Sequence, residues 1–191
     1  HVSFPGFKTM SDPRIAAVKS RIPVFPDFPK PGIQFYDIFS LFQQPSLCSD
    51  VVDLFYEHFI SKYPSTKIDA VLGLDARGFL FAPPLAEKFK ANFVPVRKSG
   101  KLPGVVASCS YSLEYGEAEI EIQEHALQKG QNVIIVDDLM ATGGTMSTAC
   151  LLAQNMNVNV IQCQCVIELT GLNGVKQLPE GTDMYSIVQF E

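Results

Sequence analysis

Apolar runs alternate along the chain with segments of helical periodicity, and this alternation predicts the fold. Runs typical of strands lie at Ile68–Leu74, Asn92–Arg97, Val133–Asp137, Asn159–Glu168 and Ser186–Phe190. Segments typical of helices lie at Pro13–Arg21, Ser49–Lys62, Pro83–Lys90 and Thr145–Asn155. Strands that alternate with helices favour an α/β fold, in which a largely parallel sheet is covered by helices on both faces. Ligands in such folds bind beyond the carboxyl ends of the strands.

Three other segments interrupt this alternation. Prolines recur from Pro23 to Pro31 among several phenylalanines. They predict an extended arm that packs against protein, because a solvated linker would not carry so many Phe residues. Lys98–Gly116 is basic and punctuated by Gly and Pro, and we assign no strand to it. Residues 117–122, EAEIEI, alternate strictly, as expected for a half-exposed strand.

The composition is that of one compact domain. Hydrophobic residues make up 47% and charged residues 18% of the 191 residues, which is enough apolar material for a large core. The net charge of −5 argues against general binding to nucleic acid or membrane surfaces, so an anionic substrate needs a local site. Residues 1–12 are expected to be a disordered tail or a remnant of expression. Residues 13–191 are expected to form one domain, with an arm over about 13–45.

The cysteines and the apolar runs bear on the compartment. The five cysteines are scattered, odd in number and without CxxC spacing, which argues against a disulfide framework or a zinc site and favours a reducing cytosol. Cys163 and Cys165 would face the same side of a strand, where buried packing is favoured over a redox pair. No apolar run approaches the roughly 20 residues that span a bilayer, and no signal peptide is visible. We therefore expect a cytoplasmic protein.

Val133–Met146, VIIVDDLMATGGTM, carries the most specific chemistry. Backbone N–H groups around its paired glycines can approach a phosphate closely, and the following helix presents its positive end to that anion. Carboxylates only accept hydrogen bonds, so the two aspartates suit neighbouring hydroxyls, and a ribose 5-phosphate meets both demands. The residues assigned to this phosphate and ribose site are Asp137, Asp138, Ala141, Thr142, Gly143, Gly144 and Thr145. The alternative is a helix cap preceded by a surface acidic pair; neither GxxxxGK[ST] nor GxGxxG is present.

The stretch VIIVDDLMATGGT resembles the signature of the type I phosphoribosyltransferase family, which binds phosphoribosyl pyrophosphate (PRPP). Other segments are similar to the adenine-using members of that family: FPDFPKPGIQFYDI, GLDARGFLFAPPLA, VRKSGKLPG, SYSLEYGEAEIEIQ and VIELTGL. The resemblance runs in order from about Arg21 to Glu191. It implies an α/β fold with a mostly parallel central sheet flanked by helices, a small hood formed by the arm, and a flexible lid loop.

The resemblance also implies an activity and its partners. The expected reaction converts adenine and PRPP to AMP and pyrophosphate, a pentosyl transfer used in purine salvage. Mg²⁺ is the implied cofactor, held mainly by PRPP and water, so we assign no residue as a direct metal ligand. A homodimer is expected, without nucleic-acid or membrane partners.

Two basic loops are expected to bind pyrophosphate. Arg77 offers a forked donor to this dense anion, and the resemblance assigns the surrounding loop to it as well. The residues assigned in this way are Asp75, Ala76, Arg77, Gly78, Arg97, Lys98 and Lys101. In the family, the equivalents of the last three can reach the site of a neighbouring subunit. The alternatives are a structural Arg77–Asp75 pair and a solvated basic loop.

The lid and the base site rest on the resemblance alone. Glu114 is expected to accept the ring proton from adenine or to return it in the reverse reaction, and Tyr115 belongs to the lid that excludes water. Gln34, Tyr36 and Leu169 are assigned to the adenine site. Tyr36 departs from the family, whose members commonly have Arg there, so base recognition or pyrophosphate-side assistance is in doubt.

Three alternatives to this activity stay open. One is a phosphoribosyltransferase with an altered purine preference, caused by changes such as Tyr36. Another is a regulatory protein that keeps the PRPP site and has weak or no catalysis, although Arg77, Glu114 and Tyr115 are retained. A relative of ribose-phosphate kinases is the third, and no ATP-binding motif supports it.

Overall fold

The computed structural model describes residues 12–113 and 116–191, and the chain divides into two compact units, residues 1–47 and 48–191. In the first unit, α1 (Pro13–Ser20) begins after Asp12, whose side chain accepts a hydrogen bond from the Arg14 backbone N–H. Strands β1 (Val24–Phe25) and β2 (Phe35–Tyr36) pair antiparallel. The 3-10 helix η1 (Ile38–Gln43) follows.

The arm between α1 and η1 exposes its apolar side chains. Val24, Phe25, Phe28 and Ile33 are 41–52% exposed, so the expectation of a packed arm is wrong for the described chain. The two paired strands are only two residues long. A sheet this small does not bury the apolar side chains of the arm.

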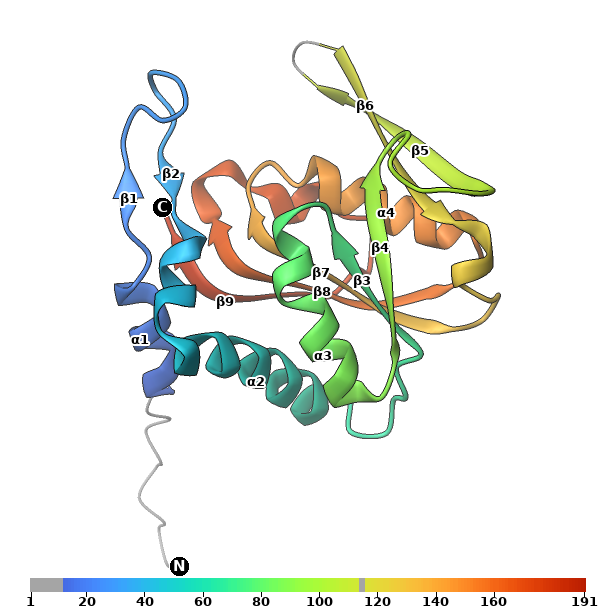
Figure 1. Cartoon of the computed structure of the whole chain (residues 1–191), viewed down its shortest axis with the longest axis horizontal. Helices are drawn as coiled ribbons and strands as arrows, with labels where there is room; N and C mark the ends of the chain where they lie inside the picture. Colours follow the sequence, from blue (N-terminus) through green and yellow to red (C-terminus); the bar gives the residue numbers. More distant parts are fainter. Residues whose placement is uncertain (1–11, 114–115) are drawn as a thin grey trace, which may run out of the picture. The chain divides into compact units, whose positions relative to one another are not determined.

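The second unit contains a seven-stranded sheet in the order β5-β6-β4-β3-β7-β8-β9. Its strands are β3 (Ala70–Leu74), β4 (Asn92–Lys98), β5 (Val106–Leu113), β6 (Gly116–Gln123), β7 (Asn132–Met140), β8 (Asn159–Leu169) and β9 (Met184–Phe190). The five strands from β4 to β9 in this order are parallel, and the β5–β6 hairpin joins the β4 edge antiparallel. The predicted α/β fold with a mostly parallel sheet is confirmed (Figure 1).

Helices cover both faces of this sheet. They are α2 (Pro45–Lys62), α3 (Ala82–Phe89) and α4 (Gly144–Asn155), with short 3-10 helices η2 (Arg77–Leu80), η3 (Glu124–Ala126), η4 (Thr170–Leu172) and η5 (Gly174–Gln177). The β3–α3–β4 and β7–α4–β8 crossovers run in opposite directions along the sheet, so right-handed connections place α3 and α4 on opposite faces (Figure 1). Phe59 of α2 packs edge-on against Phe89 of α3, which puts these two helices on one face.

One hydrophobic cluster of the second unit lies between the sheet and α4. It includes Leu72, Val94, Ile135 and Cys163, all at most 2% exposed. All five cysteines are free thiols, and Cys163 and Cys165 are buried on β8, which confirms the packing interpretation over a redox pair of these two. Within the described residues, no helix is both long and apolar enough to cross a membrane.

The largest differences from the elements predicted by the sequence lie in β5, α2 and β7. The segment Lys98–Gly116 contains the strand β5, which pairs with β6 along its whole length. Helix α2 begins at Pro45 rather than Ser49, because proline is well tolerated in a first turn. Strand β7 continues past Asp137 to Met140, because β8 pairs with it as far as Glu168.

Candidate active site

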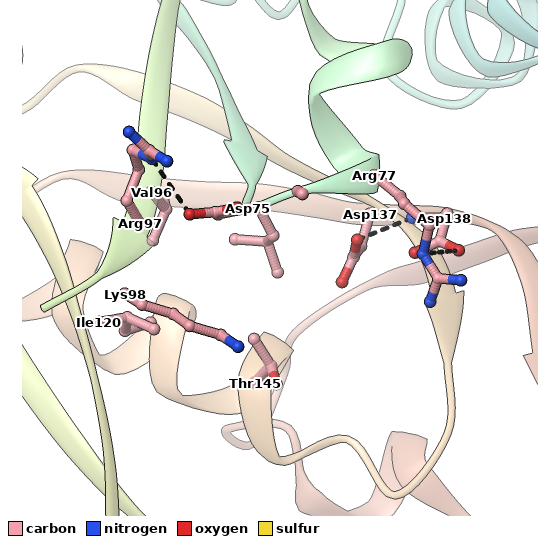
Figure 2. Close-up of a pocket in the computed structure, with 11 residues that line it drawn as sticks. Asp75, Arg77, Val96, Arg97, Lys98, Ile120, Asp137, Asp138 and Thr145 are labelled. Atoms are coloured by element: carbon pink, nitrogen blue, oxygen red, sulfur yellow. Dashed lines mark hydrogen bonds and ion pairs between the residues drawn. The ribbon is translucent and has the colours of Figure 1, made fainter. Parts of the chain in front are cut away.

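The carboxyl ends of β3, β4 and β7 meet at one edge of the sheet and enclose a pocket of about 260 Å³. It is lined by Leu74, Asp75, Ala76, Arg77, Val96, Arg97, Lys98, Ile120, Asp137, Asp138 and Thr145. Residues from all three predicted loops are therefore brought together (Figure 2). The pocket places carboxylates and cations side by side, as a ligand with both hydroxyls and anionic groups requires.

The aspartate pair on β7 is joined to the loop after β3 by an ion pair. The Arg77 Nε lies 3.0 Å from Asp138 Oδ2, and the Asp138 side chain is 5% exposed. This geometry excludes the surface acidic pair offered as an alternative. Burial raises the pKa of Asp138, and the nearby Arg77 charge opposes that rise.

The negative charge of Asp137 is less well stabilised than that of Asp138, which has the ion pair with Arg77. Burial and the adjacent Asp138 charge raise its pKa well above the ordinary value, although its Oδ1 accepts the Asp138 backbone N–H at 2.9 Å. Two carboxylates held next to each other resist ionising together. A ligand that donates hydrogen bonds to them relieves this unfavourable arrangement.

A second ion pair fixes the cations on the β4 side. Arg97 Nε donates to Asp75 Oδ2 at 3.1 Å, so Asp75 pairs with Arg97 and not with Arg77. The Arg97 Nη1 also donates to the Lys101 carbonyl at 3.2 Å. Lys98 extends across the pocket towards Thr145 (Figure 2). The alternative of a structural Arg77–Asp75 pair is wrong.

The loop between β7 and α4 is held in a left-handed turn. Gly143 has φ +86°, and a Cβ there would collide with the Gly174 backbone carbonyl. A Cβ on Gly174 would in turn collide with the carbonyl of Ala141. Helix α4 begins at Gly144 without a side-chain cap from Gly143, which suits an anion at its N-terminus.

Comparison with known proteins decides the family. Residues 39–189 match the phosphoribosyl transferase domain. The chain belongs to the phosphoribosyltransferase family. The adenine phosphoribosyltransferase of Mus musculus is 47% identical to it over 182 residues, which cover 95% of this chain and 100% of the mouse protein.

Solved structures of adenine phosphoribosyltransferases share the fold of this phosphoribosyltransferase. The Saccharomyces cerevisiae enzyme, complexed with D-2,5-dideoxy-2,5-imino-altritol 1,6-bisphosphate and adenine, is 39% identical with a TM-score of 0.89. The match covers 92% of this chain and 99% of the yeast chain. The Giardia lamblia enzyme, complexed with 9-deazaadenine, is 31% identical with a TM-score of 0.85, over 96% and 99% of the two chains. The resemblance inferred from the sequence is confirmed.

Some assigned residues lie outside the pocket lining of this phosphoribosyltransferase. Gly78 packs closely on β7, because a Cβ there would lie 2.5 Å from the Val136 carbonyl oxygen. Lys101 is exposed on the loop after β4. Ala141, Thr142, Gly143 and Gly144 form the turn beside the pocket.

The remaining assignments stay predictions. Glu114 and Tyr115 lie outside the described residues. Gln34, exposed, and Tyr36, buried, belong to the first compact unit, whereas Leu169 ends β8 in the second.

Sequence reasoning missed one polar residue next to this site. Glu121 on β6 is only 3% exposed, although the alternation of EAEIEI predicts a half-exposed strand. Its partners are backbone N–H groups of the loop after β4. Side-chain patterns do not reveal such partners, so the strand periodicity alone could not have found the residue.

The side chains of the pocket determine what kind of metal site it can form. Among the described residues, no group of three or more His, Cys, Asp or Glu side chains could hold one. The pocket offers two adjacent carboxylates, one of them paired with Arg77. This donor set fits a divalent cation that arrives with substrate phosphates and water, rather than one in a protein cage.

Proposed function

We propose that this phosphoribosyltransferase converts adenine and PRPP to AMP and pyrophosphate in purine salvage. The observation that carries the proposal is the pocket where β3, β4 and β7 end, with Asp137 and Asp138 facing Arg77 and Lys98. The similarity to adenine phosphoribosyltransferases over nearly the whole chain supports adenine as the base.

The two ends of PRPP use different parts of the pocket. The 5-phosphate binds to backbone N–H groups of the turn at Gly143 and Gly144 and to the start of α4. The ribose hydroxyls donate to Asp137 and Asp138, whose negative charges favour the positive charge that develops on the sugar ring. The pyrophosphate binds on the β3 and β4 side, next to Arg77 and Arg97. PRPP is thereby held with its reacting carbon between the two groups of residues.

The transfer breaks one bond and forms one. The N9 atom of adenine attacks the C1 atom of the ribose, and the bond from C1 to the pyrophosphate oxygen breaks with its electron pair leaving on pyrophosphate. Adenine gives up its ring proton, for which Glu114 is the assigned acceptor. Tyr115 belongs to the lid that keeps water from hydrolysing the activated sugar. Gln34, Tyr36 and Leu169 are assigned to the base.

Mg²⁺ would enter with PRPP and lessen the charge of the leaving pyrophosphate. Asp137 and Asp138 lie where they can accept hydrogen bonds from its bound waters or from the ribose. The cations of the pocket, Arg77, Arg97 and Lys98, act on the same leaving group. The proposed enzyme acts in the cytosol as a homodimer, for which the exposed apolar arm provides contact surface.

A purine panel tests the proposal. The purified chain is incubated with PRPP, Mg²⁺ and, in separate reactions, adenine, hypoxanthine and guanine, and nucleotide formation is followed. Adenine should be the preferred base by at least about tenfold in kcat/KM, equivalent to roughly 1.4 kcal/mol. An assay without PRPP is the control.

The other outcomes support named alternatives. Turnover of hypoxanthine or guanine without turnover of adenine would support the altered purine preference, for which Tyr36 in place of the family's common Arg is the specific observation. PRPP binding measured by calorimetry, with no nucleotide formed from any base, would support a regulatory protein.

A further inference from the structure

Glu121 is a buried carboxylate on β6 that has no role in the mechanism above. It is 3% exposed, and its oxygens accept three successive backbone N–H groups, from Gly100 at 3.1 Å, Lys101 at 2.8 Å and Leu102 at 2.7 Å. Successive N–H groups that converge on one anion form a nest. In this nest the anion belongs to the protein itself.

The charge of Glu121 is well matched to its surroundings. Burial raises the pKa of Glu121, but the N–H groups of Gly100, Leu102 and Lys101 together outweigh that effect and hold the pKa below its ordinary value. The side chain is therefore ionised at neutral pH. A neutral amide in its place would turn one oxygen acceptor into a donor that faces other donors.

A second set of contacts holds the same loop. Arg97 lies opposite Glu121 in the antiparallel pairing of β4 and β6. Its guanidinium donates to the Lys101 carbonyl and to Asp75 of the loop after β3. Gln123 donates to the Pro103 carbonyl at 2.9 Å. The loop between β4 and β5 is thus fixed through its backbone, while the side chain of Lys101 is exposed.

We propose that Glu121 is a positioning residue for the pyrophosphate side of the site. It fixes the backbone of Gly100–Leu102, and through that backbone it sets the direction of Lys101 and the hydrogen bond that orients Arg97. The inference rests on the proposed function, because it treats pyrophosphate as the anion these cations receive. Glu121 does not touch the substrate and acts only through the loop.

A double-mutant cycle tests this action through the loop. Glu121→Gln keeps the shape and removes the charge, and Lys101→Met removes the loop cation. Glu121→Gln should raise KM for PRPP by roughly tenfold and weaken pyrophosphate binding by a similar factor, with kcat and KM for adenine changed less than about twofold. In the double variant, the two KM effects should combine to less than their product, because both act on one interaction. Glu124→Gln is the control just after the same strand, since the Glu124 side chain is exposed and the three loop N–H groups donate to Glu121.

A failure of the positioning role can be distinguished from a failure of the proposed function. Pyrophosphate binding by calorimetry is measured on every variant, so the cycle is readable even if the wild-type chain forms no AMP. Multiplicative effects of Glu121→Gln and Lys101→Met, or equal losses for PRPP and adenine, would overturn the positioning role. If Glu121→Gln does not fold, Glu121→Asp keeps the charge on a shorter side chain and should give an intermediate rise in KM for PRPP. An unchanged KM in a folded Glu121→Asp variant would also overturn the role.

Discussion

At the scale of single residues, sequence chemistry predicts which side chains belong to the pocket, and the fold determines how they pair. Asp137, Asp138 and Arg77 are all predicted from their loops and all line the pocket. Their pairing depends on the order of strands in the sheet, which brings Arg77 to Asp138 and Arg97 to Asp75. Local spacing suggests the wrong partner for Arg77, because it compares only neighbours in the chain.

Asp137 should stabilise ligand binding at the expense of the stability of the ligand-free fold. Its pKa is raised in the folded chain, so the folded state resists ionisation that the unfolded chain accepts near pH 4. Stability is therefore fully present below about pH 4 and declines as pH rises towards the raised pKa. Asp137→Asn removes this decline and should raise the melting temperature at neutral pH, while kcat/KM for PRPP falls by at least about tenfold.

Melting curves between pH 3 and pH 8 check this expectation. The difference between Asp137→Asn and the wild type should vanish towards pH 3, where both side chains are neutral. Glu180→Gln, at an exposed position in the loop before β9, is the control and should change neither quantity. A lower melting temperature for Asp137→Asn at neutral pH would contradict the argument.

At the scale of secondary-structure elements, buried strands are predicted well and the edge hairpin is not. The runs for β3, β7 and β8 are evident because the middle of each strand is buried on both faces. Strand β5 pairs only with β6 at the edge of the sheet. Its short alternation of serines with apolar residues follows a stretch rich in Lys, Gly and Pro, which favours the interpretation of the whole segment as a loop. The contact between the phosphate turn and Gly174 is also invisible in the sequence, because it joins two backbones.

The turn before α4 gives a prediction at this scale. Gly143→Ala places a Cβ at φ +86° and against the Gly174 carbonyl. The left-handed conformation alone costs roughly 1–2 kcal/mol, and the collision adds to it by moving the turn. Gly181→Ala is the matched control, because Gly181 has φ +80° and nothing within 4 Å of its added Cβ.

Denaturant unfolding and calorimetry with AMP separate the cost of the left-handed conformation from the cost of the collision with Gly174. Gly181→Ala should lose roughly 1–2 kcal/mol of stability, the cost of the left-handed conformation alone, and keep its AMP affinity. Gly143→Ala should lose more stability and bind AMP at least about tenfold more weakly, equivalent to roughly 1.4 kcal/mol. Equal behaviour of the two variants would mean that the contact with Gly174 does not shape the phosphate turn.

At the scale of the whole molecule, the exposed arm leads to a prediction about assembly. Phe25 and Phe28 are 50% and 52% exposed, and clustered apolar side chains of this size mark an interaction surface. The sequence predicts that this arm is packed, which the described chain contradicts, yet a second copy of the chain would cover it. The proposed homodimer therefore explains why aromatic residues are present in an otherwise exposed segment.

Sedimentation velocity tests the dimer. The wild-type chain should sediment as a dimer at micromolar concentration, and the double variant Phe25→Ser, Phe28→Ser should shift towards monomer. A matched control replaces Leu151, which is 44% exposed on α4 in the other unit, with Ser, and should remain dimeric. A wild-type monomer at all concentrations would remove the proposed reason for the exposed arm.

The Arg77–Asp138 ion pair links the two halves of the pocket in the ligand-free chain. Arg77 is assigned to pyrophosphate and Asp138 to ribose, so AMP and pyrophosphate each have to separate the same two side chains. The product that binds first supplies the free energy needed to separate Arg77 from Asp138. The second product then binds to a side chain that is already released from the ion pair. Each product should consequently increase the affinity for the other by an equal factor, since such coupling is reciprocal.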